Sequence, residues 1–113
     1  MRNSGKEAEQ LAADMLRAQG LREVCRNYHC RGGEIDLIMR DGEQLVFVEV
    51  RYRSRSDYGT AAESVQQTKQ QRLTLAALHY LQKSRYSGPC RFDVVAIDGK
   101  RQPCWLKDAF QPG

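Results

Sequence analysis

The chain has 113 residues; 41% are hydrophobic, 28% are charged, and the formal net charge is +4. This composition is typical of one folded domain, and it excludes a disordered chain or a long apolar membrane span. We therefore expect a single domain over residues 1–113 with no membrane partner. The first residues lack an apolar leader and four cysteines are present, which favours reduced thiols in the cytoplasm.

A first helix is predicted over residues 3–19, because apolar residues recur there at the spacing of one helical face. These residues are Ala8, Leu11, Ala12, Met15 and Leu16. Gly20 suits the end of such a helix. Residues 21–28 alternate apolar and charged side chains irregularly, which indicates a loop or a short strand.

Two apolar runs, residues 34–39 and 45–50, then flank the dipeptide Asp41-Gly42. Asp-Gly between two β-rich runs is a strong signal for a hairpin with a two-residue turn. With Asp41 and Gly42 as the turn, Arg40 lies opposite Glu43.

A second helix is predicted over residues 66–83, a third strand over residues 92–97, and a final edge strand within residues 104–110. Gly88-Pro89 separates the helix from the third strand. The element order is thus α-β-β-α-β-(β), an α/β fold in which helices flank one mixed sheet.

The predicted hairpin places charged side chains on one face of the sheet. Because side chains alternate with a period of two, this face carries Glu34, Asp36, Glu49 and Arg51. The register places Glu34 opposite Glu49, and it makes Asp36 and Glu49 diagonal neighbours whose backbones are roughly 7–8 Å apart and whose side-chain atoms can come closer. Ile35 and Leu37 share the other face.

Three carboxylates on one patch of an apolar sheet need a counter-charge or a proton. Oxygen ligands suit Mg²⁺ or Mn²⁺, and such a cation activates water and neutralises charge on a phosphodiester. The alternative is a structural salt-bridge network at solvent-exposed strand ends, in which Arg51 or Arg53 pairs with the carboxylates. The hairpin alone leaves both interpretations open.

Asp36, followed after twelve residues by Glu49-Val50-Arg51, resembles the Asp…(Asp/Glu)-x-Lys motif of the PD-(D/E)XK nuclease superfamily. More narrowly, ordered blocks along nearly the whole chain resemble the YraN family of small bacterial proteins, which is related to archaeal-type Holliday junction resolvases. The blocks are residues 5–9 (GKEAE), 33–38 (GEIDLI), 46–51 (VFVEVR), 92–95 (FDVV) and 106–110 (LKDAF).

The resemblance implies a nuclease-like domain with a restriction-endonuclease-like three-layer core. It implies a Mg²⁺- or Mn²⁺-dependent, structure-selective DNA endonuclease, similar to Holliday junction resolvases, that hydrolyses phosphodiesters. Asp36 and Glu49 would hold the metal, helped by Glu9, with Glu34 in a supporting position. Arg51 stands where such nucleases have Lys; arginine cannot act as a base, but it stabilises the charge of the transition state. Arg51 also favours an alternative, a DNA- or RNA-binding module that keeps the fold without cleavage.

Basic residues gather after the carboxylates. Residues 1–50 carry 7 basic and 9 acidic side chains, whereas residues 51–113 carry 11 and 5. This balance indicates an anionic partner, here DNA, although a basic run is also typical of a solvated face. The candidate nucleic-acid contacts are Arg51, Arg53, Arg55, Lys69 and Arg72. Many relatives of this fold dimerise, which implies a homodimer across branched DNA.

Overall fold

In the computed structural model, which describes residues 4–52, 67–98 and 102–111, two helices and five strands form an α/β fold. The elements are α1 (Ser4–Ala18), β1 (Arg22–Cys30), β2 (Gly33–Asp41), β3 (Gln44–Tyr52), α2 (Gln67–Ser84), β4 (Cys90–Ile97) and β5 (Pro103–Leu106). One sheet contains all these strands in the order β1-β2-β3-β4-β5. β3 and β4 are parallel and the other neighbours are antiparallel, so the sheet is mixed, as the sequence predicts.

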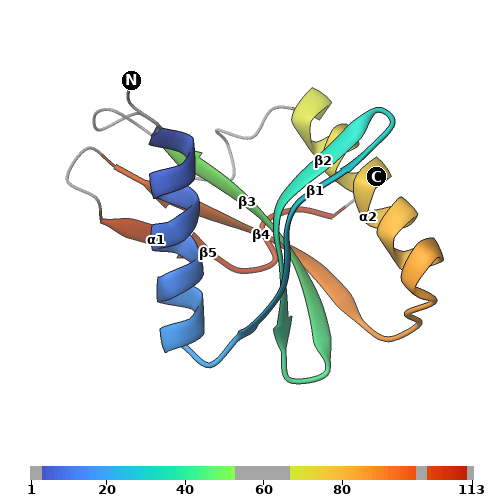
Figure 1. Ribbon diagram of the computed structural model, residues 1–113, viewed down its shortest axis with the longest axis horizontal. Coiled ribbons are helices and arrows are strands. Elements are labelled where there is room, and N and C mark those ends of the chain that lie inside the picture. The colour runs from blue at the N-terminus through green and yellow to red at the C-terminus, as the bar shows by residue number, and fades with distance from the viewer. Residues whose placement is uncertain (1–3, 53–66, 99–101, 112–113) are drawn as a thin grey trace.

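The two helices cover opposite faces of the sheet (Figure 1). Alternate strand residues divide between two cores, because successive side chains point to opposite faces. Phe47 packs in the core under α2, while Val46 and Val48 pack in the core under α1. The predicted arrangement of a sheet between helices is therefore confirmed. No helix within the described residues is both long enough and apolar enough to cross a membrane.

The end of α1 is fixed by a glycine, as the sequence predicts. Gly20 has a φ of 99°, a conformation that L side chains rarely adopt. The N–H of Leu21 donates to the carbonyl of Leu16 and the N–H of Gly20 to that of Arg17, both at 3.0 Å. This is the Schellman pattern of helix termination. It leads the chain directly into β1, the nine-residue strand that contains most of the segment expected to be a loop or a short strand.

The β2–β3 hairpin turns at Gly42 and Glu43, one residue later than predicted. Asp41 pairs with Gln44 and Arg40 with Leu45, so the predicted pairing of Arg40 with Glu43 is wrong. Gly42 has a φ of 63°, which suits the first central position of a two-residue turn. Each β2 residue therefore lies opposite a β3 residue two positions later than predicted. A shift of two keeps the predicted face for residues within this ladder.

The outer part of the β1–β2 hairpin leaves β3 and curls over α2 (Figure 1). The β2–β3 ladder ends at Leu37 opposite Val48, while β1 and β2 stay paired as far as Cys30 and Gly33. Gly33 lies directly on α2, because a Cβ at this position would clash with the carbonyl oxygen of Arg72. A glycine at the start of β2 thus lets the hairpin and the helix approach closely.

Candidate functional site

Asp36 and Glu49 come together where the β2–β3 ladder ends. The pair after Leu37 and Val48 would be Asp36 with Glu49, but the Asp36 carboxylate accepts a hydrogen bond from the backbone N–H of Val50, at 2.8 Å. The side chains of Asp36 and Glu49 also share a hydrogen bond. The two carboxyl groups are therefore in direct contact, as the predicted approach of their side-chain atoms allows.

Two further predictions about this hairpin are wrong. Glu34 does not lie opposite Glu49, since its neighbour across the sheet is His29 of β1. Ile35 does not share a face with Leu37, since Ile35 packs in the core under α2 and Leu37 in the core under α1. Both differences follow from the end of the β2–β3 ladder. Beyond it, β2 pairs with β1 alone, and two-stranded ribbons twist more strongly than wide sheets.

Burial makes the fully ionised form of this carboxylate pair unfavourable. Glu49 is only 4% exposed, and burial together with the charge of Asp36 raises the pKa of Glu49 to about 8. Burial also raises the pKa of Asp36, against the effect of the hydrogen bond from Val50. At neutral pH the Glu49 carboxyl therefore keeps a proton and donates it to Asp36, unless a cation takes the place of that proton.

Glu9 of α1 lies within electrostatic range of this pair. Burial, and then the charge of Asp36, raise the pKa of Glu9. The Glu9 side chain shares a hydrogen bond with that of Asn27, which lies at the level of Asp36 in the β1–β2 ladder. Asn27 has a φ of 52°, and asparagine tolerates this left-handed region better than most residues. β1 thus bends beside Asp36, where β2 also loses its pairing with β3.

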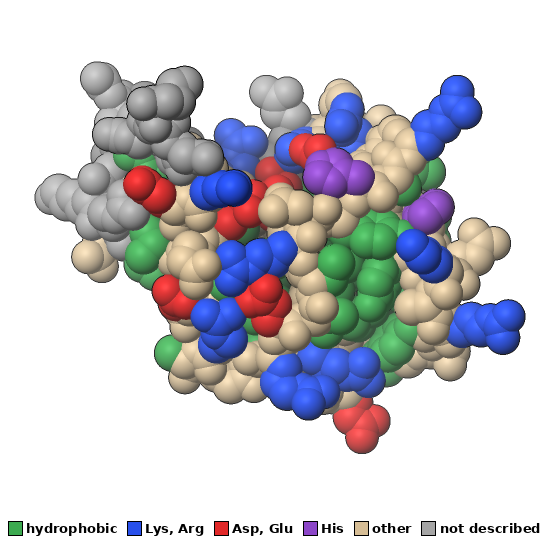
Figure 2. All heavy atoms as spheres, in the orientation of Figure 1, with side chains coloured by type: hydrophobic (Ala, Val, Ile, Leu, Met, Phe, Trp, Pro, Cys, Tyr) green, Lys and Arg blue, Asp and Glu red, His purple; other side chains and the backbone are tan. Residues whose placement is uncertain are grey.

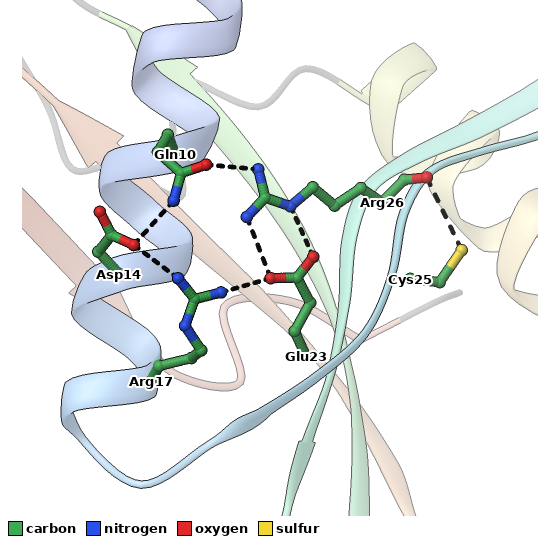
Figure 3. A network of polar contacts seen from close by, with 6 residues as sticks. All are labelled: Gln10, Asp14, Arg17, Glu23, Cys25 and Arg26. Carbon is green, nitrogen blue, oxygen red and sulfur yellow. Dashed lines mark hydrogen bonds and ion pairs between the residues drawn. The ribbon is translucent and has the colours of Figure 1, made fainter.

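A polar network holds α1 against β1 next to Glu9 (Figure 3). Its ion-paired and hydrogen-bonded members are Gln10, Asp14, Arg17, Glu23 and Arg26. Arg26 links the two elements, because its Nε donates to Glu23 at 2.6 Å and its Nη1 donates to Gln10 of α1 at 2.9 Å. Figure 2 shows acidic and basic side chains interleaved over this side of the molecule. Exposed pairs of this kind add little stability, but here they orient the helix that carries Glu9.

Lys69, in the first turn of α2, lies between two carboxylates. Its Nζ is 3.6 Å from Oε2 of Glu34 and 3.6 Å from Oε2 of Glu49. Arg72, one turn later, lies 4.0 Å from Glu34, and the Nε2 of His29 lies 3.5 Å from the same carboxylate. The structure thus brings the two cationic residues predicted on this helix to the acidic site. Contact of either residue with DNA stays a prediction.

The other predicted basic residues lie on or after β3. Arg51 follows Glu49 by two residues, and its charge lowers the pKa of Glu49 against the larger effects that raise it. Arg51 is therefore part of the electrostatic environment of the pair. Arg53 and Arg55 lie outside the described residues.

Sequence patterns did not reveal that Lys69 reaches the carboxylates, nor that His29 and Asn27 belong to the site. The spacing of residues along the chain does not predict which residues of β1, β2 and α2 contact one another. One signal was available for Lys69: a positive charge in the first turn of a helix is unfavourable next to the helix dipole. This unfavourable position indicates that Lys69 has an acidic partner.

The pair of Asp36 and Glu49 fits a hard divalent cation in chemical terms. Its donors are all carboxylate oxygens, and the buried pair needs a positive charge or a proton. Mg²⁺ in proteins is commonly held by one or two carboxylates and keeps several waters. Among the residues that the structure describes, no three Asp, Glu, His or Cys side chains are grouped to hold one metal ion. The fit therefore rests on the pair, with Glu9 nearby.

A second buried acidic residue, Asp93 of β4, is structural. Its carboxylate accepts hydrogen bonds at 2.9 Å from Nε of Arg91, from Nε1 of Trp105 and from the backbone N–H of Asp108. Asp93 is 1% exposed, and these donors compensate its charge. The group ties β5 and the segment after it to β4, and Asp93 lies opposite Val48 in the β3–β4 ladder, one residue from Glu49 and so on the other face of the sheet.

The fold and the site together define a small α/β protein in which two carboxyl groups, one of them buried, lie in contact beside Lys69 and Arg51. The chain belongs to the uncharacterised protein family UPF0102, whose model matches residues 8–97, and this confirms the YraN-family resemblance. It is 55% identical over 111 residues to a UPF0102 protein of Aeromonas hydrophila, covering 96% of this chain and 85% of that one. A UPF0102 protein of Nitrosococcus oceani is 53% identical over 115 residues, with 97% and 93% covered. These names state no activity.

Proposed function

We propose that this protein is a metal-dependent DNA endonuclease that hydrolyses phosphodiester bonds in branched DNA. The observation that carries the proposal is the contact between the carboxyl groups of Asp36, which is half-buried, and Glu49, which is buried. Such a pair is unfavourable for folding alone, and unfavourable buried charges are typical of functional sites. The divalent cation that nuclease chemistry requires would relieve the repulsion between the two carboxylates.

Exposure increases from the pair toward the cations of α2, which supports an approach of DNA from that side. Glu49 is 4% exposed, whereas the side chains of Lys69 and Arg72 are 31% and 50% exposed. A phosphate is attracted first by the exposed cations, in a salt-dependent and sequence-independent way. It then meets the carboxylate pair at the inner end of the site.

Asp36 and Glu49 are the residues that would hold Mg²⁺ or Mn²⁺, which supplies an activated water and neutralises phosphate charge when bound. Hydrolysis adds the oxygen of water to phosphorus and breaks one P–O ester bond. The products are a phosphate monoester and a hydroxyl; the water loses one proton to solvent, and the leaving oxygen takes one from solvent. Arg51 stays protonated and stabilises the negative charge on the phosphoryl oxygens. Glu9 adds a further carboxylate next to Asp36.

The proposal includes a cytoplasmic setting and a homodimer. All four cysteines are free, which supports a reducing compartment. Two copies of one small site would allow a dimer to act on two strands of a junction, and sedimentation of the protein with a four-way DNA junction measures this directly.

The test is cleavage of an end-labelled four-way DNA junction in Mg²⁺ or Mn²⁺ by the wild type and by Asp36→Asn and Glu49→Gln. We expect wild-type cleavage that needs the metal, and a loss of at least about 100-fold in both variants. The matched control is Glu43→Gln, an exposed residue of the β2–β3 turn, which should cleave as the wild type does. Equal cleavage by all the proteins would place the activity elsewhere.

A second candidate is a DNA-binding module without cleavage. Arg51 in place of the motif lysine favours it, as does the ion pair of Lys69 with Glu49, which already supplies a positive charge. In that case the protein binds the junction in a salt-dependent way. Titration with Mn²⁺ then gives the same result for the wild type and for Glu49→Gln, because Glu49 holds no metal ion.

A further inference from the structure

Lys69 is placed against the electrostatic preference of its own helix. It is the third residue of α2, and the first turn of this helix has no acidic residue. Exposed N–H groups and the helix dipole make this end of a helix favourable for anions and unfavourable for a lysine. The nearby carboxylates offset this disadvantage, so the position of Lys69 is explained by the site and not by the helix.

The contacts of Lys69 differ from those of a structural ion pair. Arg91 and Asp93 form such a pair at 2.9 Å, with both side chains nearly inaccessible. Lys69 instead lies at 3.6 Å from both Glu34 and Glu49, and its side chain is 31% exposed. Charge-assisted hydrogen bonds between nitrogen and carboxylate are usually about 2.7–2.9 Å. Among the residues that the structure describes, the ammonium is thus held near both carboxylates without a short hydrogen bond to either, which suits it to approach another anion.

Lysine also differs chemically from the arginine of β3. Lysine carries a compact charge with three donors on a flexible stem, whereas the guanidinium of Arg51 is a planar fork on a strand. Lys69 enters from α2, which Gly33 allows to approach β2 closely. A phosphate held at Glu49 through a bound divalent cation would lie beside this ammonium, because the Nζ of Lys69 is 3.6 Å from Oε2 of Glu49.

We propose that Lys69 is a catalytic residue of this site and contacts a non-bridging oxygen of the scissile phosphate, adding a second positive charge to the one that Arg51 supplies from β3. This inference rests on the proposed endonuclease function. The ammonium keeps its protons throughout and acts by its charge, which offsets the negative charge that the phosphoryl group carries as the P–O bond breaks. Glu34 is then a positioning residue, since its Oε2 lies 3.6 Å from the Nζ of Lys69.

The test compares Lys69→Met, Lys69→Arg and the control Lys83→Met, in the last turn of the same helix. Three quantities are measured: the single-turnover cleavage rate on a four-way junction in Mn²⁺, junction affinity in chelator, and Mn²⁺ affinity by calorimetry without DNA. We expect Lys69→Met to cleave at least about 100-fold more slowly, and Lys69→Arg to recover part of the rate. The Mn²⁺ affinity of Lys69→Met should equal or exceed that of the wild type, since the lysine charge that repels Mn²⁺ is removed. Lys83→Met should match the wild type.

The possible failures are distinguishable. If the wild type cleaves and Lys69→Met cleaves within threefold of it, the catalytic role of Lys69 is wrong and the endonuclease proposal stands. If Lys69→Met loses cleavage and Mn²⁺ affinity in parallel, Lys69 only maintains the carboxylates, and the inference is again overturned. If the wild type binds no Mn²⁺ and cleaves no junction, both proposals are overturned.

Discussion

The carboxylate of Asp36 accepts a hydrogen bond from the backbone N–H of Val50, at the point where the β2–β3 ladder stops. A side chain thus takes the place of a strand carbonyl. The same bond holds Asp36 against Glu49, which is the unfavourable contact at the centre of the site. A substitution that removes this contact should therefore raise the stability of the metal-free protein and lower its affinity for a metal ion.

Asp36→Asn should stabilise the metal-free protein and weaken metal binding. Asparagine keeps an oxygen for the N–H of Val50 and removes the negative charge of Asp36 from its contact with Glu49. We expect the melting temperature at pH 8 to rise by several degrees, on the order of 1 kcal/mol, while Mn²⁺ affinity falls at least tenfold. Calorimetry measures both. A variant that melts lower and still binds Mn²⁺ would show that Asp36 has only a structural role.

The metal-free protein should lose stability as the pH rises from about 5 to 8. The pKa of Glu49 is raised to about 8 in the folded protein, from 4.5. Between these two pH values the folded protein holds a proton on Glu49 that the unfolded chain has released. The stabilisation that this proton gives the folded state is complete below pH 4.5. It is lost as the pH rises through 8, and the loss is on the order of a few kcal/mol.

Denaturant unfolding in chelator at several pH values checks this dependence. Glu49→Gln should flatten the curve between pH 5 and 8, while the exposed control Glu43→Gln should keep the wild-type slope. Mn²⁺ should stabilise the wild type more at pH 8 than at pH 5, because the cation replaces a proton. Parallel curves for the wild type and Glu49→Gln contradict the account of Glu49.

Gly33→Ala should separate α2 from β2. The added Cβ meets the carbonyl of Arg72 and the backbone N of Ala76, neither of which is a flexible side chain. We expect a loss of about 1–3 kcal/mol in unfolding free energy and slower cleavage, because Lys69 moves with the helix. Gly5→Ala is the control, since nothing lies within 4 Å of its Cβ. Unchanged stability in Gly33→Ala would mean that the helix adjusts without cost.

Asp93→Ala should destabilise the fold without affecting the proposed metal site at Asp36 and Glu49. It leaves Arg91 nearly buried without its main partner, and removal of one member of a buried pair costs about 3–5 kcal/mol. Mn²⁺ affinity of the folded fraction, measured at low temperature, should match the wild type. A selective loss of Mn²⁺ binding at full stability would instead make Asp93 part of the site.

Much of this fold follows from local patterns. The apolar spacing of α1, the terminating Gly20 and the Asp41-Gly42 signal each have a short-range physical cause. The hairpin register was wrong by two residues, yet Glu49 kept its predicted face because side chains alternate with the same period. β1 was less clear, since an edge strand with many charged residues has no strong hydrophobic alternation.

The site was only partly predictable. Asp36 and Glu49 were found because two acidic residues interrupt apolar strands, a local signal. The bend at Asp36, by contrast, depends on Asn27 in another strand, and the contact of Lys69 with Glu49 depends on how α2 docks on β2. These are tertiary relationships that no spacing within one element encodes.

The most direct measurement is a crystal structure of the protein soaked in Mn²⁺, with anomalous scattering recorded at the manganese edge. The account predicts an anomalous peak bound by the carboxylate oxygens of Asp36 and Glu49, which is absent from crystals of Glu49→Gln. Crystals of the wild type with no peak at this pair, and with the Lys69 ammonium still filling the space beside Glu49, would contradict it.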